Sequence, residues 1–280
     1  MSDNKSGLYI VSTPIGNLDD ITLRSLDILK NSDIILCEDT RRSLKLLNHF
    51  SIKKKLISYH KFNEKKELNK IIEYLKEGKI LSLISDAGTP TLSDPGNLLI
   101  KECINNKIDI FPIPGASAIT ASMSVAGFED RFIFYGFLPK KEKELEKAIS
   151  DLKEENFSII FFVPAIRINF YLKFFKIHFS NRNILIAREL TKMHETLYRD
   201  TVQNIEYFKS AIKGELTVVI SQKYIKNKVS LGNDDLKKQA ITYLKKYSLK
   251  DVVELVSKKE NVSKKIIYEM CLKLKNDKNS

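Results

Sequence analysis

Short apolar runs alternate with amphipathic stretches along the first half of the chain. The apolar runs look like strands, and they lie at residues 8–12, 33–37, 55–58, 80–85 and 108–112. Between them, apolar residues recur at helical spacing over 23–30, 64–77 and 97–107. This alternation predicts an open α/β layer whose sheet is largely parallel.

The second half of the chain repeats the alternation after a turn-like segment at 136–141. Strands are predicted at 157–163, 184–188 and 215–221, and helices at 142–154, 169–175 and 202–209. With 280 residues and 43% hydrophobic content, the chain is long enough for two domains. The sequence therefore predicts an α/β domain over 1–125, a second α/β domain over 126–230 and a basic helical tail over 231–280.

The tail concentrates positive charge. Residues 236–275 hold 11 lysines and 4 acidic residues, which is +7 of the formal net charge of +12. Ser248 and Ser263 stand where helix N-caps are expected. The concentration favours a polyanionic partner such as RNA. A solvated, lysine-coated helical surface is the alternative, and the lysine, asparagine and isoleucine bias of the whole chain is of a kind that genome base composition produces.

The spacing of the cysteines and histidines limits which metal sites and disulfides the chain can form. Cys37, Cys103 and Cys271 form neither a zinc spacing nor a disulfide framework, so we expect them to be reduced and buried. The four histidines show no ligand spacing either, and no protein-bound metal is predicted. The longest apolar run is too short for a bilayer and the first residues have no signal-peptide core, so we expect a cytoplasmic protein.

Three loops that follow predicted strands are rich in Gly, Pro, Ser, Thr and Asp. They contain Gly16, Gly88 and Gly115, and a residue without Cβ lets the backbone turn sharply or approach a ligand. Ligands of open α/β sheets bind beyond the carboxyl ends of the strands, where these loops should meet in one cavity. The alternative is that these glycines only form ordinary turns.

The loops lack the glycine patterns that hold triphosphates or a pyrophosphate. A cofactor without phosphates fits better, and S-adenosylmethionine is of this kind. It needs an apolar slot for adenine, polar partners for the ribose and methionine ends, and tolerance of a sulfonium cation. Asp86 is a candidate for the ribose or for the cation, although a capping or turn aspartate is an equal reading of the same residue.

Several segments resemble those of a known family. They read STPIGNLDD at 12–20, EDTR at 38–41, SDAGTP at 85–90, SDPG at 93–96, RF at 131–132, GFLP at 136–139, ARELTK at 187–192 and HE at 194–195. Together they resemble the signature segments of bacterial ribosomal RNA small-subunit methyltransferase I, over roughly residues 7–221. This resemblance implies the two-domain α/β fold of the tetrapyrrole methylases with a small helix-turn-helix-like tail. It also implies a homodimer that uses S-adenosylmethionine to methylate the 2′-hydroxyl of a decoding-site cytidine in 16S ribosomal RNA.

The loops and the resemblance together give the candidate site residues. Candidates for cofactor binding are Pro14, Gly16, Asp86, Ala87, Gly88, Ala116, Ser117 and Ala187. A ribose hydroxyl is a poor nucleophile, so a general base or a cation near the developing alkoxide is expected. Candidates for these catalytic roles are Glu38, Asp39, Arg41, Lys192, His194 and Glu195. An ordinary helix start at 38–41 and a surface position for His194 are the alternatives.

One segment departs from the family pattern. Where the family usually has aromatic-Glu-Ser/Ala-Pro-His-Arg, residues 161–167 read FFVPAIR, so the Glu and His are absent and Arg167 is displaced by one position. This puts in doubt what the segment does for the substrate or the cofactor. In the tail, the resemblance makes Lys264, Lys265 and Lys273 candidates for phosphate contacts that position RNA.

Two other functions are compatible with the sequence. One is methylation of a corrin or porphyrin precursor, against which the basic tail and the 187–192 segment speak. The other is a non-catalytic RNA-binding or ribosome-assembly factor that keeps the fold, which the altered 161–167 segment allows. Binding of S-adenosylmethionine separates the enzymes from the assembly factor.

Overall fold

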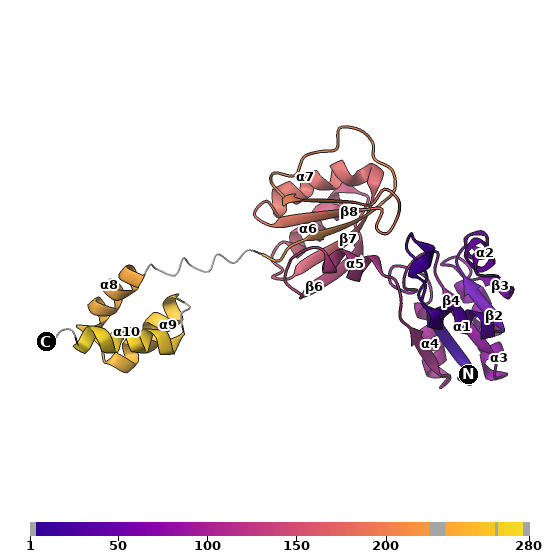
Figure 1. The fold of residues 1–280 in the computed structure, drawn as a ribbon, viewed down its shortest axis with the longest axis horizontal. Coiled ribbons are helices and arrows are strands. Elements are labelled where there is room, and N and C mark those ends of the chain that lie inside the picture. The colour runs from indigo at the N-terminus through magenta and orange to yellow at the C-terminus, as the bar shows by residue number, and fades with distance from the viewer. Residues whose placement is uncertain (1–3, 224–232, 261–262, 277–280) are drawn as a thin grey trace. The chain divides into compact units, whose positions relative to one another are not determined.

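The computed structural model describes residues 4–223, 233–260 and 263–276 (Figure 1). They form two compact units, of which the first ends at Lys223. The predicted boundary between residues 230 and 231 lies outside the described residues. Within the described residues, no helix has both the length and the apolar content needed to cross a bilayer.

The first sheet is parallel throughout and has the strand order β3-β2-β4-β1-β5. Its strands are β1 (Gly7–Val11), β2 (Ile34–Cys37), β3 (Lys55–Ser58), β4 (Ile80–Ile84) and β5 (Ile110–Ile113). The helices are α1 (Leu23–Asn31), α2 (Thr40–His49), α3 (Glu64–Lys76) and α4 (Asn97–Asn105), with a short 3-10 turn η1 (Leu18–Asp20) after β1. The predicted parallel α/β layer is confirmed.

Alternate residues of the strands feed two cores, one on each face of this sheet, because side chains alternate along a strand. Leu8, Leu81 and Leu83 pack with Ile71 of α3 and Leu99 of α4. On the other face, a second set packs with α1 and α2, and it includes Tyr9, Val11, Ile28, Leu29 and Leu47. The three cysteines are free and buried, as predicted.

The second sheet is mixed and has the order β6-β7-β10-β8-β9, with only β6 and β7 parallel. Its strands are β6 (Phe132–Phe137), β7 (Ser158–Pro164), β8 (Asn183–Arg188), β9 (Thr196–Thr201) and β10 (Glu215–Ile220). One face packs on α6 (Glu142–Leu152) and α7 (Ile168–His178), with the short η2 (Ala165–Arg167) between β7 and α7. The other face packs on α5 (Ala118–Ser124), mainly through Ile119.

Two sequence expectations for this sheet are wrong. Residues 202–209 are not helical: β9 ends at Thr201, and the chain then turns, with the N–H of Val202 donating to the Arg182 carbonyl at 2.8 Å. Val202, Ile205 and Phe208 have helical spacing, but they anchor a loop to the core. The expected turn at 136–141 begins inside β6, where Gly136 has φ +84° beside a break in the register.

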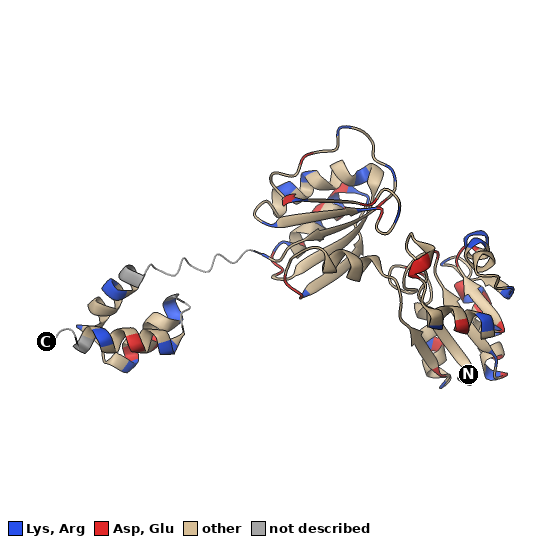
Figure 2. Cartoon of the chain, viewed as in Figure 1, with Lys and Arg blue, Asp and Glu red and all other residues tan. Residues whose placement is uncertain are grey.

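The described residues of the second unit form three helices, α8 (Asn233–Leu244), α9 (Leu249–Glu260) and α10 (Lys264–Asn276). Ser248 and Ser263 cap α9 and α10, as predicted, because their Oγ atoms each accept a backbone N–H at 3.3 Å. A small core of its own joins the helices, and Val252, Val256 and Ile267 lie in it. Figure 2 shows basic residues on all three helices.

Candidate active site

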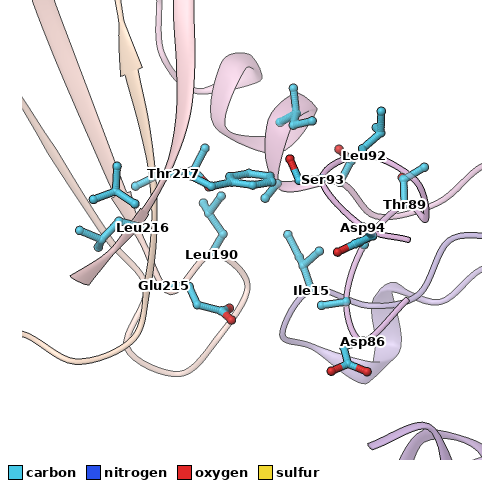
Figure 3. Close-up of a pocket in the computed structure, with 18 of the residues that line it drawn as sticks. Ile15, Asp86, Thr89, Leu92, Ser93, Asp94, Leu190, Glu215, Leu216 and Thr217 are labelled. Atoms are coloured by element: carbon cyan, nitrogen blue, oxygen red, sulfur yellow. The ribbon is translucent and has the colours of Figure 1, made fainter. Parts of the chain in front are cut away.

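A cavity of about 450 Å³ lies between the carboxyl end of the first sheet and the second sheet. Figure 3 shows its two walls facing each other, with Ile15, Thr89 and Asp94 on one side and Leu190 and Leu216 on the other. The first wall comes from the loops after β1, β2, β4 and β5. The second comes from β7, β8, β10 and the loop after β8. The volume falls within the range of pockets for small molecules and cofactors.

The structure brings the three glycine-containing loops together. Thr13 and Gly88 form an antiparallel bridge, and their two N–H···O distances are 2.9 and 3.0 Å. Gly88 has φ +79°, a conformation that favours glycine. A Cβ at Gly115 would lie 2.9 Å from the Ser12 Cβ. The turns after β1, β4 and β5 therefore pack against one another at one edge of the sheet.

Gly16 allows the loop after β1 to touch the loop after β8. A Cβ at Gly16 would lie 2.5 Å from Lys192 Cγ and 2.7 Å from Thr191 Oγ1. Thr191 has φ +65° and Glu189 has φ +52°, so two non-glycine residues of the β8 loop hold a left-handed conformation. Such conformations cost free energy and are concentrated at functional sites.

Three carboxyl groups gather on the first wall. Asp86 pairs with Arg42 at 3.2 Å and accepts the Asp39 N–H at 3.2 Å. Burial, followed by the negative charge of Glu38, raises the pKa of Asp94 to about 6. Burial, followed by the charge of Asp86, also raises the pKa of Glu38. Carboxyl groups with raised pKa values can accept a proton near neutral pH.

Lys192 links two carboxylates on the second wall. Its Nζ donates to Glu189 at 2.9 Å and to Glu215 at 3.0 Å. Burial alone lowers the pKa of Lys192, but these two hydrogen bonds outweigh it and raise the pKa. Glu189 also accepts the Glu215 N–H at 2.9 Å. The amine is therefore a fixed cation at the cavity.

The sequence-based cofactor candidates divide into two groups. Those that line the cavity are Asp86, Ala87, Gly88, Ser117 and Ala187. Pro14 is buried, while its neighbour Ile15 reaches the cavity. Ala116 offers its carbonyl to Thr89 Oγ1 at 3.4 Å. Pro14, Gly16 and Ala116 thus shape the loops that support the lining residues.

The catalytic candidates are more widely spread. Glu38 and Lys192 line the cavity. Asp39 and Arg41 pair at 2.7 Å at a second hollow next to it, and the hydrogen bonds from Arg41 hold the pKa of Asp39 at about 2. His194 and Glu195 are exposed and line neither hollow. Glu195 instead accepts the Thr191 N–H at 2.6 Å and so braces the β8 loop.

Sequence reasoning missed much of the wall. The lining residues that it did not select include Arg42, Leu92, Asp94, Leu190, Glu215 and Thr217. Asp94 and Leu190 stood inside quoted family segments, which is a signal that could have selected them. Glu215 and Thr217 carried no signal, because the face of a strand that meets a cavity depends on how the second sheet is placed.

The altered 161–167 segment lies at the cavity. Phe162, Val163 and Pro164 line it, at the end of β7. Arg167 turns away, since its Nη2 donates to the Lys140 carbonyl at 2.8 Å and its guanidinium lies 4.9 Å from the Phe170 ring centroid. The departure from the family pattern therefore leaves an apolar surface at this part of the wall.

Comparisons of the sequence with known proteins agree on one family. The sequence model of the family Tetrapyrrole (Corrin/Porphyrin) Methylases matches residues 7–206. A ribosomal RNA small subunit methyltransferase I of Mesomycoplasma conjunctivae is 46% identical over 218 residues, which cover 77% of this chain and 91% of that protein. The protein of the same name from Rickettsia prowazekii is 42% identical over 279 residues and is covered to 98%, against 97% of this chain.

Solved structures resemble the chain in fold alone. The methyltransferase CobJ superposes with a TM-score of 0.60 at 16% identity, covering 78% of this chain and 94% of its own. A uroporphyrin-III C-methyltransferase from Thermus thermophilus, complexed with S-adenosyl homocysteine, superposes with a TM-score of 0.55 at 12% identity, covering 77% and 97%.

Proposed function

Because this chain belongs to the tetrapyrrole (corrin/porphyrin) methylases, and among them to the ribosomal RNA small subunit methyltransferase I family, we propose that it methylates ribosomal RNA. In full, the proposal is transfer of a methyl group to the 2′-hydroxyl of a cytidine ribose in the decoding region of 16S ribosomal RNA. The main supporting observation is that the loops after β1, β2, β4 and β5 and the loop after β8 all line the same cavity.

S-adenosylmethionine is the methyl donor of this family, and the cavity suits it. Five carboxyl groups and two cationic side chains line the cavity, so its net charge favours a ligand with a sulfonium and an ammonium group. Ile15 and Leu190 offer an apolar surface for adenine, and Asp86 and Asp94 offer acceptors for the polar ends. When bound, the cofactor supplies an electrophilic methyl group.

The residues of the chain have two tasks in this reaction. Methyl transfer is an in-line displacement, so the two walls contribute mainly by fixing the orientation of the reactants and excluding water. Glu38 lines both the cavity and the hollow beside it, and we assign it the proton of the 2′-hydroxyl. Lys192, held by Glu189 and Glu215, is the cation that stabilises negative charge on the ribose oxygen.

The proposal extends to the rest of the chain. Lys264, Lys265 and Lys273 are exposed on α10 and contact RNA phosphates in this account. The protein acts as a homodimer on the small ribosomal subunit in the cytoplasm, with its chain divided at about residues 125 and 230. Relatives of similar length support including the tail, since the Rickettsia prowazekii protein aligns over 97% of this chain.

The test uses small subunits from cells that lack this gene. The purified protein and S-adenosylmethionine are added, and ribose methylation is mapped along the 16S RNA by primer extension at low nucleotide concentration. We expect one new stop, at a cytidine of the decoding region. An unchanged pattern, with cofactor binding intact in calorimetry, would contradict the proposed substrate. Absence of cofactor binding would support an assembly factor instead.

A further inference from the structure

A second hollow, of about 430 Å³, adjoins the cavity and shares Glu38 and Asp86 with it. It lies beyond the carboxyl ends of β2, β3 and β4, and residues 60–62, just after β3, form its outer rim. A ligand that fills this hollow therefore contacts Glu38. None of the functions assigned above uses this rim.

Phe62 stands on the rim with 94% of its surface exposed. The turn that holds it is well bonded: the Asn63 side chain accepts the His60 N–H at 2.8 Å and donates to the Ser58 carbonyl at 2.8 Å. The Phe62 N–H donates to His60 Nδ1 at 3.2 Å. These hydrogen bonds hold the turn, and burial of the Phe62 ring does not contribute to its stability. The exposed ring is therefore available to stack on a ligand.

Two cations line the same hollow as this ring. Lys61 is exposed and has no ion-pair partner among the residues that the structure describes. The Arg41 side chain is 86% exposed, and Asp39 fixes its guanidinium through Nε at 3.1 Å and Nη2 at 2.7 Å. An exposed aromatic ring together with nearby cations is the combination that binds single-stranded nucleic acid, through base stacking and phosphate contacts.

We propose that the turn of residues 60–62 is the docking platform for an unstacked nucleotide of single-stranded RNA, with its base on the Phe62 ring and its phosphates at Lys61 and Arg41. This inference rests on the proposed function and specifies its substrate as an unpaired nucleotide, because a base inside a duplex has no free face for the ring. The base enters the hollow from the rim, and the ribose of the docked strand faces Glu38.

The composition of the chain allows a direct optical test. The sequence contains no tryptophan, so Phe62→Trp places a single indole on the platform. Leu23→Trp is the control, since Leu23 is 86% exposed and lines neither hollow. Titration with an oligocytidylate of about ten nucleotides should quench the emission of Phe62→Trp to saturation and leave that of Leu23→Trp unchanged. Binding that is seen by anisotropy of labelled RNA without quenching at residue 62 would overturn the proposal, as would equal quenching by an RNA duplex.

Enzyme kinetics give a second, independent readout. Phe62→Ala should raise the KM for undermethylated small subunits about 5- to 150-fold, which corresponds to the loss of one base–aromatic stack, with little change in kcat. Phe62→Tyr should restore the KM, and Leu23→Ala should behave as the wild type. The dissociation constant of S-adenosylmethionine should be the same in all four proteins, because Phe62 does not line the cofactor cavity.

The two proposals fail in different ways. A wild-type protein that binds S-adenosylmethionine but methylates no ribosomal RNA would contradict the proposed function. A wild-type protein that methylates ribosomal RNA, together with a Phe62→Ala variant of unchanged KM, would overturn the platform alone.

Discussion

The backbone N–H of Asn17 donates a hydrogen bond of 3.0 Å to the side-chain oxygen of Thr191, and it joins two loops that are 174 residues apart. Asn17 follows Gly16 in the loop after β1, and Thr191 belongs to the loop after β8. The contact lies at one side of the cavity, because Ile15 and Leu190, which precede the two partners, both line it. The geometry of the cavity therefore depends on the close approach at Gly16.

Gly16→Ala tests this dependence. The new Cβ would lie 2.5 Å from Lys192 Cγ and 2.8 Å from the Leu190 carbonyl oxygen, so the loops must separate. Crowding of this kind costs about 1–3 kcal/mol, and we expect S-adenosylmethionine to bind about tenfold or more weakly in calorimetry. Gly78→Ala is the control: it adds a Cβ in open space at φ +81° and should lower stability while leaving cofactor affinity unchanged. Equal affinities of Gly16→Ala and wild type would count against the closure.

The second prediction concerns the proton of the ribose hydroxyl. Glu38→Gln keeps the shape of the side chain but cannot accept a proton, so kcat should fall about 10²- to 10⁴-fold while the cofactor dissociation constant changes little. Methyl transfer is followed under single-turnover conditions with labelled cofactor. Glu73→Gln, on the exposed surface of α3, is the matched control and should keep the wild-type rate. A nearly normal rate in Glu38→Gln would remove Glu38 from the mechanism.

Asp94 should make stability depend on pH. Its pKa is about 6 in the folded chain against 3.8 in the unfolded one, so the folded state holds the proton more tightly. The corresponding stability is present below about pH 4 and is lost as the pH rises through about 6. Asp94→Asn lacks this titration. The Tm of the variant should therefore rise relative to the wild type between these pH values, as measured by circular dichroism. A difference in Tm that is constant with pH would contradict the burial of this carboxyl group.

The tail should determine how RNA binding responds to salt. Replacing Lys264, Lys265 and Lys273 by Gln removes three exposed charges from α10. The slope of the logarithm of the RNA association constant against the logarithm of the salt concentration should then become shallower by about 2 to 3. The control carries Gln at Lys143, Lys147 and Lys153, which are exposed on or next to α6. Its slope should match that of the wild type. Identical slopes in both triple variants would show that the tail contributes no specific phosphate contacts.

Much of the fold could be predicted from the sequence, for a physical reason. The strands of the first sheet are buried apolar runs bounded by turn residues, and their observed limits differ from the expected ones by at most two residues. Residues 202–209 misled the prediction, because Val202, Ile205 and Phe208 have the spacing of a helical face. These residues belong to a loop in which the Val202 N–H donates to the Arg182 carbonyl and the three side chains pack against the core. Periodicity alone does not distinguish such a loop from a helix.

The site was predictable only in part. Glycines and aspartates directly after strands indicated the first wall, because turn residues at a strand end can be recognised from the neighbouring sequence alone. His194 and Glu195 are close to Lys192 in sequence, yet the left-handed conformation of Thr191 turns the chain, and both are exposed outside the cavity. Leu216 and Thr217 lie on a strand, and only the placement of the second sheet brings them opposite the first wall.

We propose that this cavity serves methyl transfer to a ribose oxygen of ribosomal RNA. The most direct test is mass spectrometry of nucleosides from undermethylated small subunits, after incubation with S-adenosylmethionine and either the wild type or Glu38→Gln. We expect 2′-O-methylcytidine with the wild type and little or none with the variant. A methyl group on a base, or no methylated nucleoside with the wild type, would contradict it.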